Sequence, residues 1–546
     1  MKIALAQLNY HIGNFEYNTK KIIDHIALAK AGGADLVVFA ELAVCGYPPR
    51  DFLEFEEFIA LCEDAAKEIA SHCKGIACII GLPVKNEAVA GKDLYNAAYF
   101  IEEGEVKATV KKALLPNYDI FDEYRYFEPA TAFECIDFKG TRIALTICED
   151  LWNINNNPLY ISNPMDVLIT QNPDVMINIA ASPFSYEHDD ARMVVLSDNA
   201  KKYKLPLLYV NQVGAQTEII FDGGSLAYNN EGQLLDEMPY FKEHLRTYTL
   251  VNGTFEGYTP VAHAESSDIA QIHDALVLGI KDYFGKSGFS KAVLGLSGGI
   301  DSAIVCALAC RALGPENVMA VLMPSKYSSD HSIRDALDLV ENFGCKHEII
   351  AIKEAADAFD SMLAHAFEGL SFNLTEENIQ ARSRGIVVMA MSNKFGYILL
   401  NTSNKSECAV GYGTLYGDMC GAIGVIGDVY KTQIYQLAHY INKDGEVIPE
   451  NTIVKPPSAE LRPGQKDSDS LPDYDTLDAI LYQFIELKKS SAAIIAQGYD
   501  EAIVKRILKL VNGAEFKRYQ TPPILRVSPK AFGMGRRMPI VGKYLA

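Results

Sequence analysis

The chain has 546 residues, a length that predicts at least two large domains. Its hydrophobic content of 49% and charged content of 22% are ordinary for globular domains, so each domain can build a normal core. The formal net charge of −20 argues against a protein that wraps nucleic acid or lies on an anionic membrane, because both are polyanions.

The first half of the chain alternates apolar runs of strand length and of helix length. The predicted strands are residues 2–9, 35–41, 75–84, 94–101, 141–148, 175–181 and 205–213. Residues 15–31 and 54–71 repeat apolar side chains at helical spacing, and residues 41–49 and 113–127 are predicted loops. This alternation indicates a layered α/β fold.

Three reactive side chains stand at or near the ends of predicted strands: Glu41, Lys112 and Cys148. A thiol becomes a nucleophile when a base or a cation lies beside it. Glu41 could take the proton of Cys148, and Lys112 could stabilise an oxyanion. Each also has an ordinary interpretation, as a strand-end charge, a solvated lysine and a core thiol, and for a cysteine taken alone the core interpretation is favoured.

The segments around these residues change that balance. Phe39-Ala-Glu-Leu-Ala-Val-Cys-Gly-Tyr47, Lys112-Ala-Leu-Leu-Pro116 and Ile147-Cys-Glu-Asp-Leu-Trp152 resemble the nitrilase, or carbon–nitrogen hydrolase, superfamily. The resemblance covers roughly residues 1–250 and implies an α-β-β-α sandwich. It also implies a triad that cleaves amide bonds through a thioester, with Glu41 as base, Lys112 as the lysine and Cys148 as nucleophile. Lys111 is a rival for the lysine, but the spacing to Leu115-Pro116 favours Lys112.

The same resemblance implies contacts to an amide substrate. It adds Tyr118 and Ser182 as glutamine contacts. Many relatives also carry a cation shortly after the Ser-Pro pair that begins at Ser182. Here that cation is His188 or Arg192, or it is missing.

The alternation of apolar strand and helix segments stops at residues 251–268, which are predicted to be a linker. A second domain is then predicted over residues 269–546. Residues 269–283 then predict a helix. Further elements are a strand at 293–296, a helix at 303–313, and strands at 318–323 and 348–352. A doubly wound parallel sheet of this kind binds ligands at the carboxyl ends of its strands.

The loop from Ser297 to Ser302 lies between the strand and the helix of this second domain. Gly298 and Gly299 permit a sharp turn, and the free N–H groups at the helix start attract anions. Asp301 would repel a phosphate unless it holds a divalent cation that bridges to it. No G-K-[ST] follows the glycines, so this is not a Walker A loop, and the ordinary interpretation is a turn with capping serines. Ser-Gly-Gly-Ile-Asp-Ser resembles the loop of ATP-pyrophosphatase amidoligases, which activate a carboxylate as an adenylate.

Several polar segments follow in an order that is more specific than the loop alone. They are ENIQAR, NTSNKSE, GYGTLYGD, DVYKTQ, KPPSAELRPGQ, LPDYDTLD and EFKRYQTPP. With the nitrilase-like half they resemble the glutamine-dependent NAD synthetases over essentially the whole chain. That family uses ATP, magnesium and glutamine to convert nicotinate adenine dinucleotide to NAD, releasing AMP, pyrophosphate and glutamate.

The resemblance implies ligands for particular residues. The expected ATP contacts are Gly295, Leu296, Ser297, Gly298, Gly299, Ile300, Asp301, Ser302, Thr402 and Lys431. The expected dinucleotide contacts are Asn378, Glu407, Tyr412, Leu415 and Lys517. Asp301 and Glu407 are the candidates for Mg²⁺, and Glu407 remains open between metal and dinucleotide.

Two other enzymes remain as alternatives: an amidoligase for a different carboxylate, and a tRNA-modifying relative, against which the net charge weighs. A non-catalytic scaffold is weaker, because the reactive residues are intact. The start of the chain predicts a strand rather than a signal peptide, so we expect reduced cysteines, a cytoplasmic protein, and no membrane or nucleic-acid partner. We also expect a homo-oligomer, at least a dimer, and an enclosed path for ammonia between the two sites.

Overall fold

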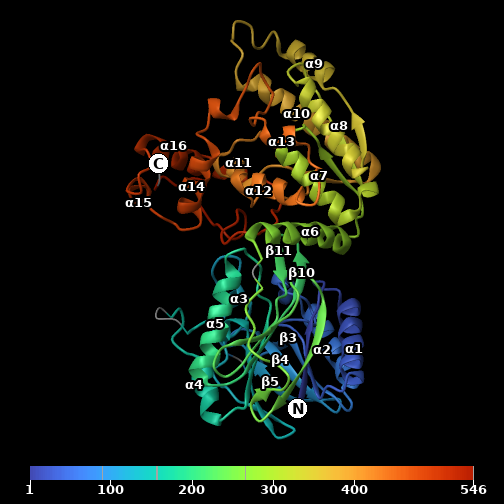
Figure 1. Ribbon diagram of the computed structural model, residues 1–546, viewed down its shortest axis with the longest axis vertical. Coiled ribbons are helices and arrows are strands. Elements are labelled where there is room, and N and C mark those ends of the chain that lie inside the picture. The colour runs from blue at the N-terminus through green and yellow to red at the C-terminus, as the bar shows by residue number, and fades with distance from the viewer. Residues whose placement is uncertain (89, 155–157, 265, 545–546) are drawn as a thin grey trace. The chain divides into compact units, whose positions relative to one another are not determined.

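The computed structural model describes residues 1–88, 90–154, 158–264 and 266–544 (Figure 1). Contacts divide the chain into two compact units, Met1–Glu265 and Ser266–Ala546, which are described separately. In the part of the chain described, no helix combines the length and the apolar character needed to cross a membrane.

Two sheets form the centre of the first unit. One has seven strands in the order β15-β14-β1-β2-β3-β4-β5, and the other has six in the order β13-β12-β9-β8-β7-β6. The strands of the first sheet are β1 (Lys2–Gln7), β2 (Leu36–Val38), β3 (Ala77–Lys85), β4 (Leu94–Glu102), β5 (Glu105–Lys111), β14 (His244–Val251) and β15 (Thr254–Phe255). Those of the second are β6 (Ile136–Phe138), β7 (Thr141–Ile147), β8 (Val175–Ala180), β9 (Leu207–Asn211), β12 (Leu226–Tyr228) and β13 (Leu234–Glu237). A separate hairpin pairs β10 (Val213–Gln216) with β11 (Ile219–Asp222).

Helices cover the outer face of each sheet. In Figure 1, α1 (Phe15–Ala31) and α2 (Glu56–Ser71) lie on one side, and α4 (Pro164–Leu168) and α5 (His188–Tyr203) on the opposite side. Side chains alternate along β1 as a two-residue period requires: Ile3 and Leu5 join the core shared with the second sheet, and Ala4 and Ala6 pack in the core with α1 and α2. The expected α-β-β-α sandwich is confirmed.

The structure differs from the predicted elements in several places. β5, β6 and α5 were not predicted, and β2 is shorter than residues 35–41, so that Glu41 lies in the turn after it. The first unit also continues past residue 250, because β15 pairs with β14 inside the predicted linker. The helix expected from residue 269 is α6 (Asp268–Ser287), capped by Ser267.

A five-stranded parallel sheet organises the second unit, in the order β18-β17-β16-β19-β20. Its strands are β16 (Ala292–Gly295), β17 (Val318–Leu322), β18 (Lys346–Ile349), β19 (Ile398–Asn401) and β20 (Ile423–Gly424). The chain moves outward from β16 through β17 to β18, then returns to place β19 on the other side of β16. The strand order therefore reverses between β16 and β19, and a doubly wound sheet opens a crevice at that point.

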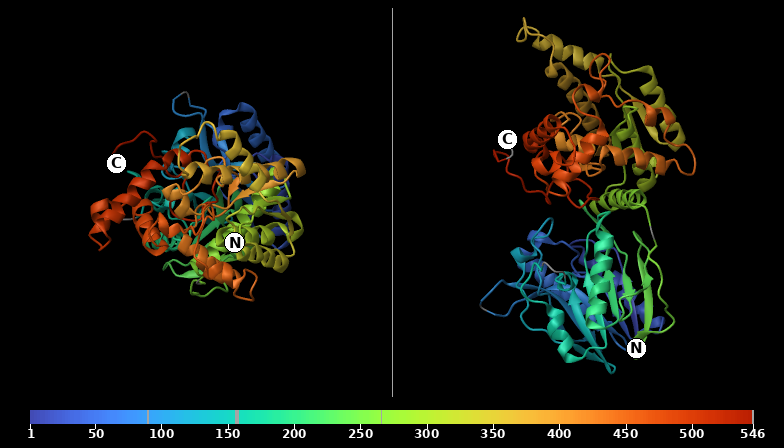
Figure 2. Two further views of the ribbon diagram at one scale, coloured as in Figure 1. Left: turned by 90° about the horizontal axis from the view of Figure 1, so that it is seen from above. Right: turned by 60° about the vertical axis from the view of Figure 1, so that its left-hand side comes forward.

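Helices surround this sheet, and the C-terminal helices gather on one side of the unit (Figure 2). Leu477, Ile480 and Leu481 on α14 share a core with Val504 and Ile507 on α16. The helices of the second unit after α6 are α7 (Ile300–Leu313), α8 (Asp330–Phe343), α9 (Lys353–Leu363), α10 (Leu374–Phe395), α11 (Lys405–Val410), α12 (Lys431–Ile441), α13 (Glu450–Val454), α14 (Tyr474–Ile485), α15 (Ser491–Ile495), α16 (Glu501–Gly513) and α17 (Glu515–Arg518).

Candidate active sites

The first candidate site, called here the thiol site, comprises Glu41, Lys112, Glu123 and Cys148. Glu41 follows β2, Lys112 follows β5, and Cys148 follows β7 directly, so residues from both sheets meet there. Gly81 on β3 makes room for the turn that carries Glu41, since a Cβ at Gly81 would lie 2.4 Å from the backbone nitrogen of Leu42.

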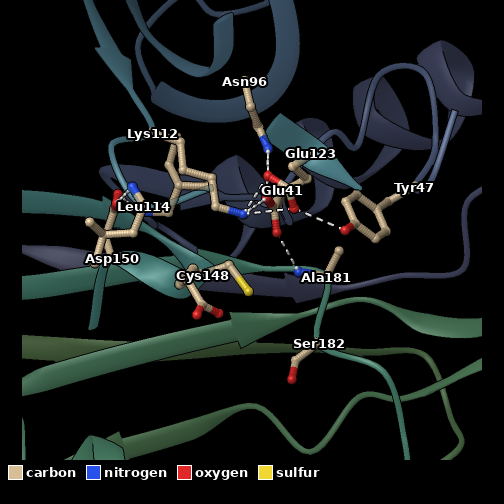
Figure 3. Close-up of polar contacts among 12 residues, drawn as sticks. Glu41, Tyr47, Asn96, Lys112, Leu114, Glu123, Cys148, Asp150, Ala181 and Ser182 are labelled. Carbon is tan, nitrogen blue, oxygen red and sulfur yellow. Dashed lines mark hydrogen bonds and ion pairs between the residues drawn. The ribbon is translucent and has the colours of Figure 1, made fainter. Parts of the chain in front are cut away.

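Lys112 is the centre of the thiol site (Figure 3). Its Nζ lies 2.7 Å from Glu41 Oε1 and 2.8 Å from Glu123 Oε2, and the side chain is fully buried. Burial alone would lower the pKa of Lys112, but the carboxylates of Glu123 and Glu41 outweigh it and hold the pKa well above its ordinary value. Lys111 points elsewhere, with its ammonium 3.8 Å from the centre of the Tyr95 ring, so the choice of Lys112 agrees with the geometry.

Both oxygens of Glu41 are held in place. Oε1 accepts from Asn96 Nδ2 at 2.7 Å as well as from Lys112, and Oε2 accepts from the backbone N–H of Ala181 at 3.0 Å. Ala181 follows β8 in the second sheet, so this bond fixes the Glu41 carboxylate across the sandwich.

Glu123, the second carboxylate on Lys112, was not among the predicted site residues. Its Oε1 accepts from Tyr47 Oη at 2.9 Å, and burial, followed by the charge of Glu41, raises its pKa against the opposing effect of Lys112. The only sequence signal was its place in the predicted loop at 113–127. In the structure it begins the short helix α3 (Glu123–Tyr126).

Cys148 lies beside Glu41 and Lys112 in Figure 3 and begins a short 3₁₀ helix, Cys148–Leu151. Its φ is +43°, a left-handed conformation that residues with a Cβ rarely adopt and that concentrates at functional sites. Burial, and next the negative charge of Glu41, raise the pKa of the Cys148 thiol well above its ordinary value. The resting group is therefore a thiol, and its reaction as a nucleophile needs a base to take the proton.

Asp150 ties the turn of Cys148 to the loop after Lys112. Its Oδ1 accepts from the backbone N–H groups of Ala113 at 3.0 Å and Leu114 at 2.9 Å, and Oδ2 accepts from Ile147 N–H at 3.0 Å. The bonded segments leave β5 in one sheet and β7 in the other. The Asp150 carboxylate thus links the backbone that follows Lys112 to the backbone that precedes Cys148.

The residues expected to contact an amide substrate have different surroundings. Tyr118 is 42% exposed and donates to Glu149 Oε1 at 3.0 Å, and Ser182 is buried directly after Ala181. Arg192 is buried in a two-pronged ion pair with Asp222, at 3.0 and 2.7 Å, so its charge already has a partner within the fold. His188 is the first residue of α5, but its side chain lies outside the described part of the structure.

Replacing Glu123 by Gln should lower reaction at Cys148 by about 10²-fold, because Lys112 loses one of its two carboxylates while the volume stays the same. The free energy of unfolding should fall by about 2 kcal/mol, since a bond between charged groups is lost. The rate of thioester formation measures the first effect and thermal unfolding the second. Glu128→Gln, outside the thiol site, is the control. An unchanged rate in folded Glu123→Gln would exclude a role for Glu123 in the chemistry.

The second candidate site, called here the phosphate-loop cleft, is a cavity of about 570 Å³ in the second unit. It lies where the strand order reverses, since the residues after β16 and after β19 line it. Of the expected ATP contacts, those that line it are Gly295, Leu296, Ser297, Gly299, Ile300, Asp301, Ser302, Thr402 and Lys431. These residues therefore lie together around one cavity.

Gly298 does not line the cleft but shapes its loop. Its φ is +82°, and a Cβ there would lie 2.1 Å from the carbonyl oxygen of Ser332, so only glycine fits. Ser302 Oγ donates to the Gly299 carbonyl at 3.0 Å, and the Gly299 N–H donates to Ser297 Oγ at 3.2 Å. The loop is thus built before any anion binds.

Asp301, Glu407 and Lys431 form a charged cluster in the cleft. Lys431 Nζ donates to Asp301 Oδ2, and Asn404 Nδ2 donates to Asp301 Oδ1 at 3.0 Å. Burial, and next the charge of Asp301, raise the pKa of Glu407 well above its ordinary value. Two carboxylates thus face one ammonium, and hard oxygen donors of this kind suit Mg²⁺. The donor set fits that ion.

The expected dinucleotide contacts divide between two places. Glu407 and Tyr412 line the cleft, whereas Asn378, Leu415 and Lys517 do not. Lys517 Nζ donates to the carbonyls of Gly411 and Gly413, both at 2.7 Å. The Leu415 carbonyl accepts from Arg382 Nε at 3.2 Å, and Asn378 Oδ1 accepts from Thr414 Oγ1 at 2.7 Å. These contacts hold the loop at residues 411–418 in place.

Asp467 and Arg384 also line the cleft, and neither was among the expected ligand contacts. Asp467 accepts from Tyr412 Oη at 3.2 Å and Tyr474 Oη at 2.9 Å, and burial, the largest effect, raises its pKa. The guanidinium of Arg384 donates to the Met323 carbonyl at 3.1 Å, and burial lowers its pKa. The KPPSAELRPGQ segment, residues 455–465, ends two residues before Asp467.

Comparisons with known proteins agree with this division. The model of the carbon-nitrogen hydrolase family matches residues 2–257, and that of the NAD synthase family matches residues 272–521. The chain is 46% identical to a glutamine-dependent NAD(+) synthetase from Synechocystis over 98% of both chains, and 41% identical to one from Acinetobacter baylyi over 99% of this chain and 98% of that relative.

Solved structures are similar to this chain over nearly its full length. The structure of a glutamine-dependent NAD+ synthetase from Acinetobacter baumannii in complex with ADP is 39% identical, with a TM-score of 0.79 over 99% of this chain and 98% of that chain. A glutamine-dependent NAD(+) synthetase from Cytophaga hutchinsonii is 22% identical, with a TM-score of 0.83 over the same shares, and shares the fold.

Proposed function

Because the chain belongs to the family of glutamine-dependent NAD(+) synthetases, we propose that it converts nicotinate adenine dinucleotide to NAD with ATP and the amide nitrogen of glutamine. It is a ligase whose other products are AMP, pyrophosphate and glutamate. The observation that carries this proposal is identity of 46% over nearly the full length of a family member. Glutamine hydrolysis is assigned to the first unit and amidation to the second.

Glutamine is cleaved at the thiol site. The Cys148 thiol gives its proton to Glu41 as its sulfur attacks the glutamine amide carbon, and Lys112 stabilises the oxyanion that forms. Glu41 then passes the proton to the departing nitrogen, so that ammonia leaves and a thioester remains. Water, activated by Glu41, releases glutamate and restores the thiol. The buried bonds that hold Glu41 support its role as the base.

Amidation takes place in the phosphate-loop cleft. The substrate carboxylate attacks the α-phosphorus of ATP, pyrophosphate leaves, and ammonia displaces AMP from the adenylate. The preformed loop at residues 297–302 binds phosphate oxygens through backbone N–H groups and the start of α7. Asp301 and Glu407 would hold Mg²⁺, which neutralises phosphate charge when bound. Lys431 lies beside both carboxylates and pairs with phosphate.

The dinucleotide extends from the cleft toward the loop at residues 411–418. Tyr412 and Glu407 line the cleft, which supports a position near them for the acceptor carboxylate. Asn378, Leu415 and Lys517 support that loop and are proposed to meet the far part of the dinucleotide. In the first unit, Tyr118 and Ser182 are proposed glutamine contacts, and the third contact remains His188 or absent because Arg192 is paired with Asp222.

A direct assay tests the reaction. With ATP, Mg²⁺, glutamine and nicotinate adenine dinucleotide, the chain should form NAD, AMP and glutamate in equal amounts. Replacing the dinucleotide by another carboxylate should stop AMP formation, which separates this function from that of other amidoligases. ADP in place of AMP among the products would refute the adenylate route.

Nitrogen should pass between the two sites without mixing with the solvent, because protonated ammonia is no nucleophile. The reaction is run with unlabelled glutamine and with ¹⁵N-ammonium too dilute to support synthesis alone. We expect almost entirely light nitrogen in the NAD amide. A label that follows the composition of bulk ammonia would show that the nitrogen escapes.

Two further properties are proposed. A homo-oligomer, at least a dimer, is supported by exposed apolar side chains on α10 and the segment before it, namely Leu370, Phe372, Leu374, Ile386, Met389 and Phe395. A cytoplasmic location is supported by the cysteines, all eleven of which are free thiols.

A further inference from the structure

Three thiols of the second unit converge away from both candidate sites. Cys306 and Cys310 lie one turn apart on α7, and Cys345 directly follows Gly344, which caps α8. Their sulfur atoms all lie within 4.8 Å of one another, and Cys306 Sγ is 4.0 Å from Cys345 Sγ. Among the described residues, no other three His, Cys, Asp or Glu side chains bring their ligand atoms so close.

The spacing has the size of a metal site. A zinc–thiolate bond is about 2.3 Å and zinc is tetrahedral, so two sulfurs on one ion lie about 3.8 Å apart. The 4.0 Å between the sulfur atoms of Cys306 and Cys345 is close to that spacing. It is about twice the length of a disulfide bond, so these are separate thiols.

The ordinary interpretation is that three small apolar side chains fill a core. Cysteine is often buried for that reason, and α7 is otherwise rich in Ala and Ile. That interpretation accounts for each residue singly but not for sulfurs from α7 and from a segment 39 residues away that meet at one point. All three cysteines are buried, and Cys310 and Cys345 keep a small exposed fraction of 5% and 6%.

We propose that Cys306, Cys310 and Cys345 bind one soft cation of the zinc class. A divalent ion displaces three thiol protons, which pass to solvent, and forms three metal–sulfur bonds with no change of oxidation state. The ligands are soft, in contrast to the hard carboxylates of Asp301 and Glu407, so Mg²⁺ would not compete for them.

The bound ion would join α7 to the short segment between α8 and β18. α7 begins at the phosphate loop, and Cys345 leads into β18 at the edge of the sheet. An ion held by both would fix α7 against that edge. It would also stabilise the native second unit by mass action, because the unfolded chain does not hold the three thiols together.

Cadmium is a suitable probe, because its thiolate complexes absorb in the ultraviolet. The experiment uses the full chain carrying Cys148→Ala, so that the nucleophile binds no ion. Titration with Cd²⁺ should give absorption that saturates at one ion per chain, and a large excess of Zn²⁺ should reduce it by competition, because thiolates bind the softer Cd²⁺ more tightly. The added substitution Cys345→Ala should remove this absorption, and Cys310→Ala should weaken binding at least tenfold.

The matched control is Cys78→Ala, which breaks a buried pair of thiols 3.0 Å apart in the first unit and should leave the absorption intact. Thermal unfolding without metal first identifies variants that are folded. Zn²⁺ should then raise the unfolding temperature of the parent chain and of Cys78→Ala, but not of Cys345→Ala. Equal cadmium absorption in folded Cys345→Ala and its parent, or no absorption in the parent, would overturn the proposal.

Discussion

Replacing Cys148 by Ala is expected to abolish NAD synthesis from glutamine, by a factor on the order of 10³ or more, while synthesis from ammonium continues. The thioester cannot form without the sulfur, whereas the phosphate-loop cleft keeps every residue that it uses. The two rates are compared by measuring NAD with glutamine and with a high concentration of ammonium chloride as nitrogen source. The substitution should change the stability of the fold little, since Ala fits in the space that Cys occupies.

Cys62→Ala is the control for this experiment. Cys62 is a fully buried thiol on α2, outside the thiol site, and its loss should leave both activities near those of the parent. If a folded Cys148→Ala chain loses synthesis from ammonium as well, the two sites do not act separately and the division of labour proposed above is wrong.

Replacing Asp301 by Asn should reduce synthesis from both nitrogen sources by about 10²-fold or more, because the substitution keeps the shape and removes the charge proposed to hold Mg²⁺. Thioester formation at Cys148 should continue. The measurement is NAD formation from glutamine and from ammonium, together with the Mg²⁺ concentration that gives half the maximal rate, which should rise. Lys431 would also lose the partner of its ion pair.

An exposed carboxylate on the same unit provides the comparison. Asp338→Asn, on the outer face of α8, removes one negative charge without entering the cleft and should change neither rate. Near-normal synthesis from ammonium by Asp301→Asn, with an unchanged requirement for Mg²⁺, would mean that Asp301 is not a ligand of the metal.

The sequence predicted those parts of the sites that depend on local pattern. Cys148 and the loop from Ser297 to Ser302 follow buried parallel strands, whose continuous apolar runs are easily recognised. The carboxyl ends of such strands lie at one edge of a sheet, so their neighbours in space could be inferred. Most of the residues expected to bind ATP do line one cavity, and their binding role remains a prediction.

Partners that depend on tertiary contacts could not be predicted. Asn96 is a polar residue within an apolar strand, and Glu123 follows in a loop; their pairing is seen only in the structure, where Asn96 Nδ2 and Lys112 Nζ both donate to the Glu123 carboxylate. α5 was missed because its buried face includes Arg192 and Asn199, whose partners Asp222 and Leu151 are distant in sequence. β5 was not predicted because it is an edge strand. Its three charged residues, Glu105, Lys107 and Lys111, are exposed or half-exposed and interrupt the alternation of apolar and polar side chains.

Asp150 has a consequence for motion in the first unit. It joins the backbone after Lys112 to the backbone before Cys148, while Ala181 joins the second sheet to Glu41. Sliding of one sheet over the other would have to break these buried bonds before it could lengthen the gap between the base, the cation and the sulfur. Slow relative motion of the two sheets should therefore leave the distances among Glu41, Lys112 and Cys148 unchanged. We therefore expect the three groups to keep their spacing, even though they come from two different sheets.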